Sequence, residues 1–224
     1  MPPVRPQLYV SLAAALTTAS CGSDTAAPTA PGSPGAPSAV IRHIVVLGDS
    51  LAVSPSASQS FPAVLQSRLQ SAYPGWTVRN ESANGDTTAG GVRRVDAALT
   101  PETRILVLEL GANDGLRGVE IAAIERNLAT IVERAQARGI RVLLCGMETP
   151  PFNGWNYSVE FHRVFPRLAA RYAVPLVPFL LEGVALNPEF NGDDTIHPNA
   201  AGAKVIADTV WRYLEPLVVQ VSAG

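Results

Sequence analysis

The chain has 224 residues, which is enough for one sizeable domain and too few for two ordinary ones. Its formal net charge is -2, and Lys and Arg do not gather along any predicted face. This charge pattern excludes the basic surface that nucleic-acid-binding proteins use, so nucleic acid is not an expected partner.

The first 21 residues have the pattern of an export signal. Arg5 supplies a positive charge, and the apolar run 8–16 that follows is too short to span a bilayer as a mature helix. The run ends in Thr18-Ala19-Ser20-Cys21-Gly22, which resembles a bacterial lipoprotein signal, in which small residues precede a cysteine that becomes acylated. We therefore predict a signal peptide over 1–21 with lipidation of Cys21. Ordinary secretion with an incidental cysteine is the alternative.

Residues 22–39 are rich in Pro, Gly, Ala and Ser, and a segment of this composition cannot bury a core. We expect a semi-extended tether there, followed by a catalytic domain over 40–218 and a C-terminal tail over 219–224. A tether behind a lipidated Cys21 would associate the domain with a membrane while holding it off the surface. The expected location is therefore the periplasm or the cell surface.

From residue 40 onward, short β-branched runs alternate with longer amphipathic segments. Strands are predicted at 41–47, 77–80, 104–110, 141–144 and 175–177, and helices at 61–72, 90–99, 119–138, 158–172 and 200–214. The clearest helix is 119–138, in which apolar residues recur at spacings of three and four before Gly139. The alternation predicts an α/β fold, a three-layer α/β/α sandwich around a mainly parallel sheet of about five strands.

The first predicted strand runs into Gly48-Asp49-Ser50. In an open α/β sheet, ligands bind at the carboxyl ends of the strands, which is where this stretch falls. Glycine permits a tight turn, and Ser50 comes near a helix start, where backbone N–H groups can stabilise a developing negative charge. Serine is also a common helix N-cap, so Ser50 alone does not establish a nucleophile.

A second polar stretch, Asp194-Thr195-Ile196-His197-Pro198, precedes the last predicted helix. Residues three apart in a turn can meet, so Asp194 can accept from His197 Nδ1–H and leave Nε2 free to take a proton from a serine. Alternatively, Asp194 caps the helix that follows. The chain has 3 histidines without metal-ligand spacing, so we expect neither a metal nor another cofactor.

Two more strand ends carry residues that can donate to an oxyanion. Gly111-Ala112-Asn113-Asp114 follows the third strand and offers the Asn113 amide, and the loop after the second strand offers the backbone N–H of Gly85. Each stretch is also a common turn former. Together, however, the four strand ends supply a nucleophile, a base, an orienting carboxylate and oxyanion donors, which is the set that acyl transfer requires.

In these four blocks the chain resembles the SGNH hydrolase, or GDSL esterase, family, and it is most similar to the arylesterase and lysophospholipase-like acyl-CoA thioesterase branch. The resemblance covers about residues 40 to 218 and implies the flavodoxin-like fold of that family. It also implies specific roles. These are Ser50 as nucleophile, His197 as base, Asp194 as its orienter, and an oxyanion hole made by Ser50 N–H, Gly85 N–H and the Asn113 amide.

The predicted activity is hydrolysis of small-molecule carboxylic esters, extending to acyl thioesters, through an acyl-Ser50 intermediate. Residues predicted to contact the substrate are Asp49, Leu51, Leu116, Phe152, Trp155, Tyr157 and Ile196. The apolar and aromatic residues after the fourth strand favour an acyl or aryl pocket. Core packing is the alternative for these aromatics.

Three other functions are weighed against this one. Deacetylation of a sugar uses the same chemistry on the same fold. A flavodoxin-like phosphate or FMN binder would need further glycines after Gly48, which the first loop lacks. A non-catalytic surface lipoprotein would be expected to have lost Ser50, Asn113 or His197, and all are present.

Overall fold

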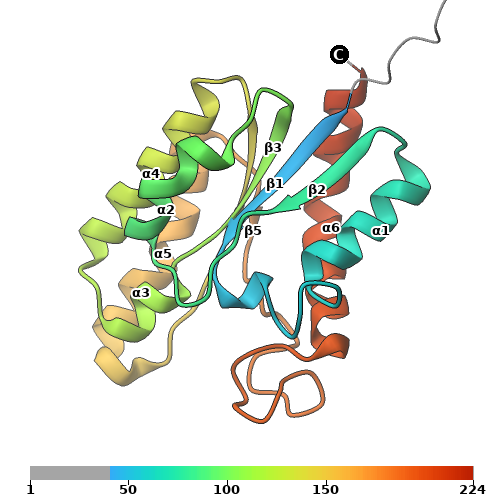
Figure 1. Ribbon diagram of the computed structural model, residues 1–224. Helices are drawn as coiled ribbons and strands as arrows, with labels where there is room; N and C mark the ends of the chain where they lie inside the picture. Colours follow the sequence, from blue (N-terminus) through green and yellow to red (C-terminus); the bar gives the residue numbers. More distant parts are fainter. Residues whose placement is uncertain (1–40, 224) are drawn as a thin grey trace, which may run out of the picture. The chain divides into compact units, whose positions relative to one another are not determined.

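A parallel sheet runs through the centre of the computed structural model, which describes residues 41–223 (Figure 1). Its strand order is β2-β1-β3-β4-β5, and every neighbouring pair is parallel. The strands are β1 (Arg42–Gly48), β2 (Trp76–Asn80), β3 (Thr103–Glu109), β4 (Arg141–Cys145) and β5 (Leu176–Val177).

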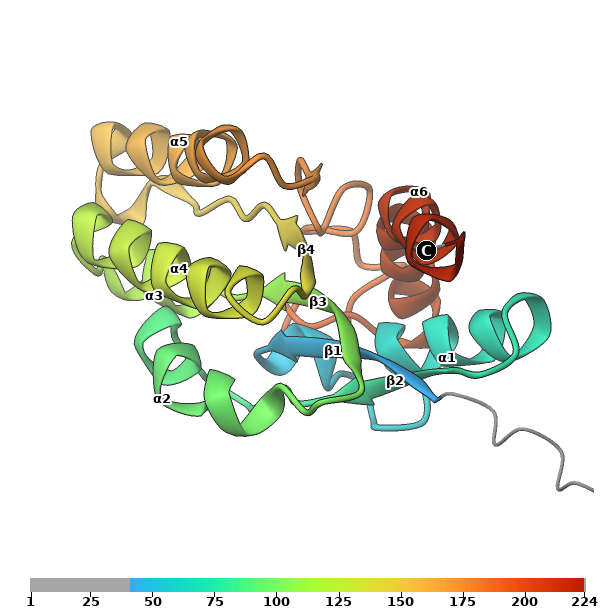
Figure 2. The ribbon, with the colours of Figure 1, turned by 90° about the horizontal axis from the view of Figure 1, so that it is seen from above.

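Helices cover both faces of this sheet. They are α1 (Phe61–Ala72), α2 (Thr88–Ala98), α3 (Ala112–Arg117), α4 (Ile121–Gln136), α5 (Trp155–Tyr172) and α6 (Ala200–Ala223), with short 3₁₀ turns η1 (Ser50–Ala52) and η2 (Pro151–Asn153). Figure 2 shows α1 and α6 on one face of the sheet and α2, α4 and α5 on the other. The predicted three-layer α/β/α fold is confirmed.

The two central strands, β1 and β3, are apolar on both faces because helices cover both faces. Ile44 to Leu47 in β1 and Ile105 to Leu108 in β3 are all fully buried. The two strands pair in register, Leu47 opposite Leu108 and Gly48 opposite Glu109. Their carboxyl ends therefore lie side by side, and the loops that follow start from neighbouring points.

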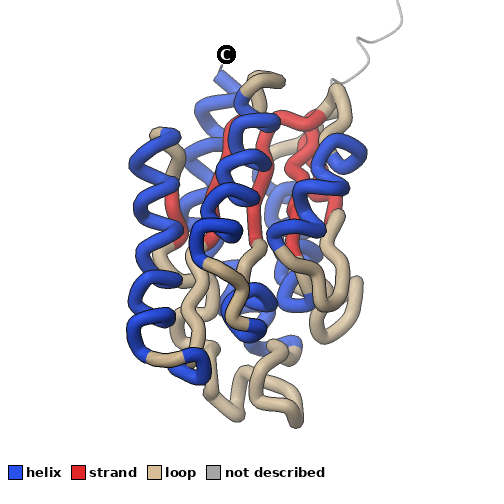
Figure 3. The backbone as a smooth tube through the Cα atoms, turned by 90° about the vertical axis from the view of Figure 1, so that its left-hand side faces the viewer, coloured by secondary structure: helices blue, strands red, loops and turns tan. Residues whose placement is uncertain are grey.

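The order in which the strands are added to the sheet reverses between β1 and β3, so the carboxyl ends of these two strands form a switch point. After β1 the chain moves outward to β2 at one edge, then returns past β1 to build β3, β4 and β5. Ligands of open α/β sheets bind at such a switch point, outside the carboxyl ends of the strands. Figure 3, with strands in red, shows the longer loops gathered at one end of the sheet.

Two stretches differ from the predicted helices. The stretch beginning at Ala112 forms the six-residue helix α3, which is too short to show a periodic pattern in the sequence. The last helix is longer than the predicted 200–214, because α6 continues to Ala223 and so includes most of the predicted tail over 219–224. Val218 is fully buried and Val221 packs against the core, so the last turns of the helix have an apolar face to cover.

The predicted signal peptide, Cys21 and the tether lie outside the described residues. Within 41–223, no helix has both the length and the apolar character needed to cross a membrane.

Candidate active site

Ser50 lies two residues after the end of β1 and begins the short 3₁₀ turn η1. Asp49 caps the short turn η1, and its Oδ1 accepts a hydrogen bond of 2.9 Å from Leu51 N. Leu51 and Ala52 point into the core, and Ser54 N donates back to Ser50 O at 3.0 Å. The backbone of Ser50 is therefore fixed on both sides, while its hydroxyl is directed away from the core.

His197 brings its ring to this hydroxyl from a distant part of the chain. Its Nε2 lies 2.8 Å from Ser50 Oγ, and its Nδ1 lies 2.5 Å from Asp194 Oδ2. The other carboxylate oxygen of Asp194 accepts from the backbone N–H groups of Ile196 and His197, at 3.0 and 2.9 Å. The hydrogen bond to the ring, together with these two backbone bonds, lowers the pKa of Asp194 below its ordinary value. The carboxylate therefore stays charged beside the ring.

The loop that carries these two residues is exposed in its middle and fixed at its ends. Asn191 is buried, and its Nδ2 donates to Val184 O at 2.6 Å and to Asn187 O at 2.8 Å. Gly192 N donates to His197 O at 2.8 Å, which closes the loop on itself. These bonds hold the ring in place without burying it.

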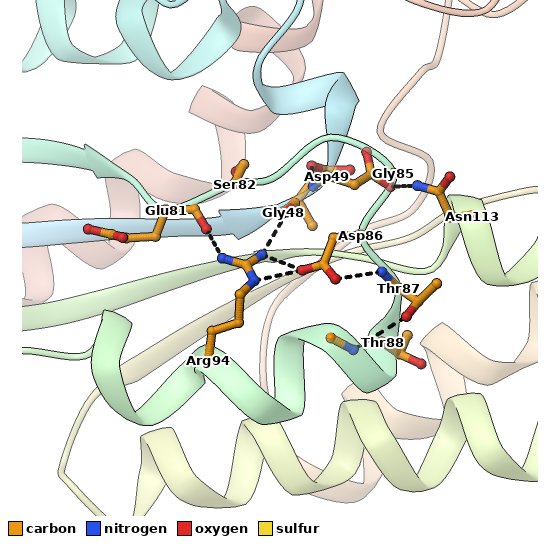
Figure 4. Close-up of polar contacts among 12 residues, drawn as sticks. Gly48, Asp49, Glu81, Ser82, Gly85, Asp86, Thr87, Thr88, Arg94 and Asn113 are labelled. Atoms are coloured by element: carbon orange, nitrogen blue, oxygen red, sulfur yellow. Dashed lines mark hydrogen bonds and ion pairs between the residues drawn. The ribbon is translucent and has the colours of Figure 1, made fainter.

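The residues predicted as oxyanion donors come from two further loops. Gly85 has a φ of +68°, a backbone conformation that favours glycine, and its carbonyl accepts from Arg117 Nη2 at 3.1 Å. Asn113 lies in the first turn of α3 and its Nδ2 donates to Asp49 Oδ2 at 3.0 Å. Figure 4 shows Asn113 beside Asp49, the residue that precedes Ser50. One amide hydrogen is used in this bond, and the second is free for another acceptor.

Below Asp49 lies a second carboxyl group, Glu109, the last residue of β3. Both side chains are fully buried, and Glu109 Oε2 accepts from Asp49 N at 3.0 Å. Burial raises the pKa of Asp49 to about 6, while burial and the nearby Asp49 charge raise the pKa of Glu109 well above its ordinary value. Only glycine fits at Gly48, because a Cβ there would lie 2.2 Å from Glu109 Oε2.

Three of the predicted substrate contacts are buried or already hydrogen-bonded within the protein. Asp49 is fully buried, and its carboxylate accepts from Asn113 Nδ2 and from Leu51 N. Leu51 is 3% exposed because its side chain packs into the core. Tyr157 is half-buried, and its hydroxyl donates to Val119 O at 2.7 Å, which fixes α5 to the chain before α4.

The other four predicted contact residues reach solvent. Leu116 on α3, Phe152 in η2, Trp155 at the start of α5 and Ile196 in the base-bearing loop are 43%, 78%, 75% and 50% exposed. Each belongs to a segment that follows the carboxyl end of a strand.

Glu109 is a site residue that the sequence motifs do not include, although an acidic residue at the end of an apolar strand is a signal that could have pointed to it.

No group of three or more His, Cys, Asp or Glu side chains in residues 41–223 is placed to hold a metal ion. Cys145 is a free cysteine, and its side chain is fully buried in β4.

Comparisons with known proteins find relatives that match most of the chain. A model of the GDSL-like Lipase/Acylhydrolase family matches residues 46–205. Esterase TesA of Pseudomonas aeruginosa is 40% identical over 183 residues, covering 80% of this chain and 91% of the relative. Thioesterase 1/protease 1/lysophospholipase L1 of Escherichia coli is 38% identical over 178 residues, covering 78% of this chain and 84% of the relative.

Solved structures give the same picture. The crystal structure of TesA has a TM-score of 0.74 at 40% identity, and the match covers 79% of this chain and 99% of that one. The esterase EstA from Pseudoalteromonas sp., in a structure inhibited by monoethylphosphonate, has a TM-score of 0.73 at 28% identity and covers 78% of this chain and 97% of that one.

Proposed function

The chain belongs to the GDSL-like lipase/acylhydrolase family of SGNH esterases, and from this premise we propose that it cleaves esters through an acyl intermediate on Ser50. The predicted family and the predicted class of enzyme, an ester hydrolase, are both confirmed by these relatives. The observation that carries the proposed chemistry is the hydrogen-bonded series from Ser50 Oγ through the His197 ring to Asp194.

In the first step, His197 Nε2 accepts the hydroxyl proton as Ser50 Oγ forms a bond to the carbonyl carbon of the ester. The π electrons of the carbonyl move to its oxygen and give a tetrahedral oxyanion. Asp194 accepts from Nδ1–H, which fixes the tautomer of the ring and stabilises the imidazolium that forms. Its lowered pKa keeps it in the charged form that this role needs.

The oxyanion is bound by the N–H groups of Ser50 and Gly85 and by the second amide hydrogen of Asn113. When the tetrahedral intermediate collapses, the bond to the alcohol oxygen breaks and the imidazolium returns its proton to that leaving oxygen. A water molecule then attacks the acyl-Ser50 ester with His197 again acting as base. The products are the carboxylic acid and the free enzyme.

The four exposed apolar residues at the carboxyl ends of the strands support an acyl or aryl group as the part of the substrate that is recognised. Leu116, Phe152, Trp155 and Ile196 present aliphatic and aromatic surface there. Such surface suits a fatty-acyl or aryl ester, or an acyl thioester, better than the hydroxyl-rich ring of an acetylated sugar. A hydrolysis profile across p-nitrophenyl esters from acetate to palmitate measures this preference.

A fluorophosphonate probe tests the nucleophile directly. The EstA structure contains an enzyme inhibited by a phosphonate, and this chain resembles EstA over 78% of its length. Wild-type protein should be labelled covalently, and Ser50→Ala should lose both the labelling and roughly 10⁴ to 10⁶ in kcat, because the covalent route is gone. Folded wild-type protein that remains unlabelled would exclude the proposed mechanism, and so would Ser50→Ala with a tenth of the activity.

We infer the location of the enzyme from the leader alone. The pattern of residues 1–21 supports export, and Cys21 followed by the Pro-rich stretch supports a lipid anchor with a tether. Detergent phase partitioning should move the wild-type protein into the detergent phase and leave Cys21→Ala in the aqueous phase. Equal partitioning of the two would reduce the leader to a plain secretion signal.

A further inference from the structure

The guanidinium of Arg94, on α2, connects three separate segments beside the site (Figure 4). Its Nη2 donates to Gly48 O at 3.0 Å, its Nη1 donates to Glu81 O, and its Nε donates to Asp86 Oδ2 at 2.7 Å. The Arg94 side chain is 29% exposed and that of Asp86 is 12% exposed. Each of the three guanidinium nitrogens therefore has at least one partner within the protein.

The first of these contacts, from Arg94 to Gly48 O, holds the backbone just before the nucleophile Ser50. Gly48 O belongs to the peptide group directly before Asp49-Ser50. The N–H of the same peptide group, Asp49 N, donates to Glu109 Oε2 at 3.0 Å on the other side. Ala83 N, in the loop after β2, also donates to Gly48 O, at 3.1 Å. This peptide plane is thus held from both sides, and its orientation sets the direction in which the chain enters Ser50.

The third contact bears on the loop that carries Gly85. Asp86 follows Gly85 directly, and its Oδ1 accepts from Thr87 N at 2.9 Å while its Oδ2 meets Arg94. The carboxylate lies where a side chain at position 90 would otherwise be, since a Cβ on Gly90 would come within 1.7 Å of Asp86 Oδ1. Glycine at position 90 therefore allows Asp86 to reach Arg94.

We propose that Arg94 is a positioning residue for the reaction, which holds the turn before Ser50 and the Gly85 loop at a fixed separation through Gly48 O and Asp86. The inference rests on the proposed function, in which the N–H groups of Ser50 and Gly85 bind one oxyanion together. Two donors that must converge on one atom need a fixed separation. A planar guanidinium can hold two acceptors at once, whereas a lysine ammonium is a point charge on a flexible stem.

Kinetics of Arg94→Gln and Arg94→Lys test this role, with p-nitrophenyl acetate as substrate. We expect kcat to fall about 10- to 100-fold for Arg94→Gln, because a small misplacement of the donors weakens binding of the transition state more than binding of the substrate. KM should change by less than about threefold. Arg94→Lys should be intermediate. Arg93→Gln, an exposed neighbour on the same helix, is the matched control and should keep the wild-type kcat.

Gly90→Ala separates positioning from a merely structural role. Alanine is the better helix former, so the substitution favours α2 itself. The added Cβ nevertheless displaces the Asp86 carboxylate from Arg94. The gain in helix propensity offsets part of the cost of displacing this 12% exposed carboxylate, so we expect kcat to fall about tenfold while Tm changes by no more than about 5 °C. This variant also keeps the test open if Arg94→Gln does not fold.

The outcomes distinguish this proposal from the one on which it rests. If the fluorophosphonate probe labels the wild type and Arg94→Gln keeps the wild-type kcat, the positioning role is overturned and the proposed function stands. A rise in KM as large as the fall in kcat/KM would also overturn it, because Arg94 would then bind substrate. Gly90→Ala with full activity would overturn the link through Asp86. An unlabelled wild type would overturn both proposals.

Discussion

Two carboxylate-bearing regions meet at Ser50, and they lie in opposite environments. The base loop, residues 192–198, presents Asp194 and His197 with side chains 49% and 39% exposed. The carboxyl floor, Asp49 and Glu109, is fully buried. It lies next to the nucleophile turn, which is the turn η1 that begins at Ser50. The base loop is held at its ends by backbone hydrogen bonds, whereas the floor is enclosed by the central strands.

The two aspartates show what this difference does. In the base loop, hydrogen bonds from the His197 ring and from two backbone N–H groups lower the pKa of Asp194. In the floor, burial outweighs the bonds from Leu51 and Asn113 and raises the pKa of Asp49 to about 6. Water and donors favour the charged carboxylate, and removal of water disfavours it. The exposed region is thus suited to proton transfer, and the buried region to holding the backbone in place.

The comparison predicts that substitutions in the base loop change activity far more than stability. Asp194→Asn should lower kcat by up to about 10⁴, because an amide can favour the wrong tautomer of His197 and cannot stabilise the imidazolium. Since Asp194 is half exposed, the free energy of unfolding should change by less than about 1 kcal/mol. Steady-state kinetics and denaturant unfolding of the same preparations measure both quantities.

Asp193→Asn is the matched control for this prediction. Asp193 is an exposed neighbour in the same loop, four residues before His197, and it should lose far less activity. A larger defect in Asp193→Asn than in Asp194→Asn would mean that the orienting carboxylate has been assigned to the wrong residue.

Asn113 is bonded to Asp49 in the carboxyl floor and is also a proposed oxyanion donor, so its substitution should affect both activity and stability. Asn113→Ala should lower kcat by about 10² to 10³ with little change in KM, because the amide acts on charge that exists mainly in the transition state. It should also cost about 1 to 3 kcal/mol of stability, because Asp49 Oδ2 loses its buried donor. Full stability with reduced activity would show that the bond to Asp49 contributes little, and an effect confined to KM would make Asn113 a substrate-binding residue.

The sheet and the positions of the site loops can be predicted from the sequence because both follow from periodicity. Apolar runs such as 41–47 and 104–110 are typical of buried strands, and parallel strands bring their carboxyl ends to one edge. This is why the sequence alone predicts that Ser50 and Asn113, which are far apart in the chain, lie near each other.

The features that the sequence does not predict depend on tertiary burial. Gly48-Asp49-Ser50 has the composition of a surface turn, which favours a substrate contact for Asp49, although neighbouring strands enclose this residue. Glu109 and Arg94 belong to no local motif, since their partners lie in other elements at large sequence separation. No local pattern predicts which of many arginines meets a given carbonyl.

Glu109→Gln should have the smallest effect on activity and should change how stability depends on pH. Burial raises the pKa of Glu109 in the folded protein above the ordinary glutamate value of about 4.3. The folded state therefore holds this proton more tightly than the unfolded state, and the stabilisation is complete below about pH 4 and is lost as pH rises toward the raised pKa. Glutamine keeps an oxygen to accept from Asp49 N but has no proton to lose.

We therefore expect the unfolding free energies of wild type and Glu109→Gln to be closest near about pH 4, and the variant to gain on the wild type as pH rises, by up to about 1.4 kcal/mol for each pH unit. Tm measured from about pH 4 to 8 follows this difference, with the exposed Glu182→Gln as a control that should track the wild type throughout. Since Asp49 N keeps its acceptor, kcat should stay within about threefold of the wild-type value. A difference in stability that is the same at every pH would mean that Glu109 is ionised in the folded protein, and the floor would then hold two charges beside the nucleophile turn.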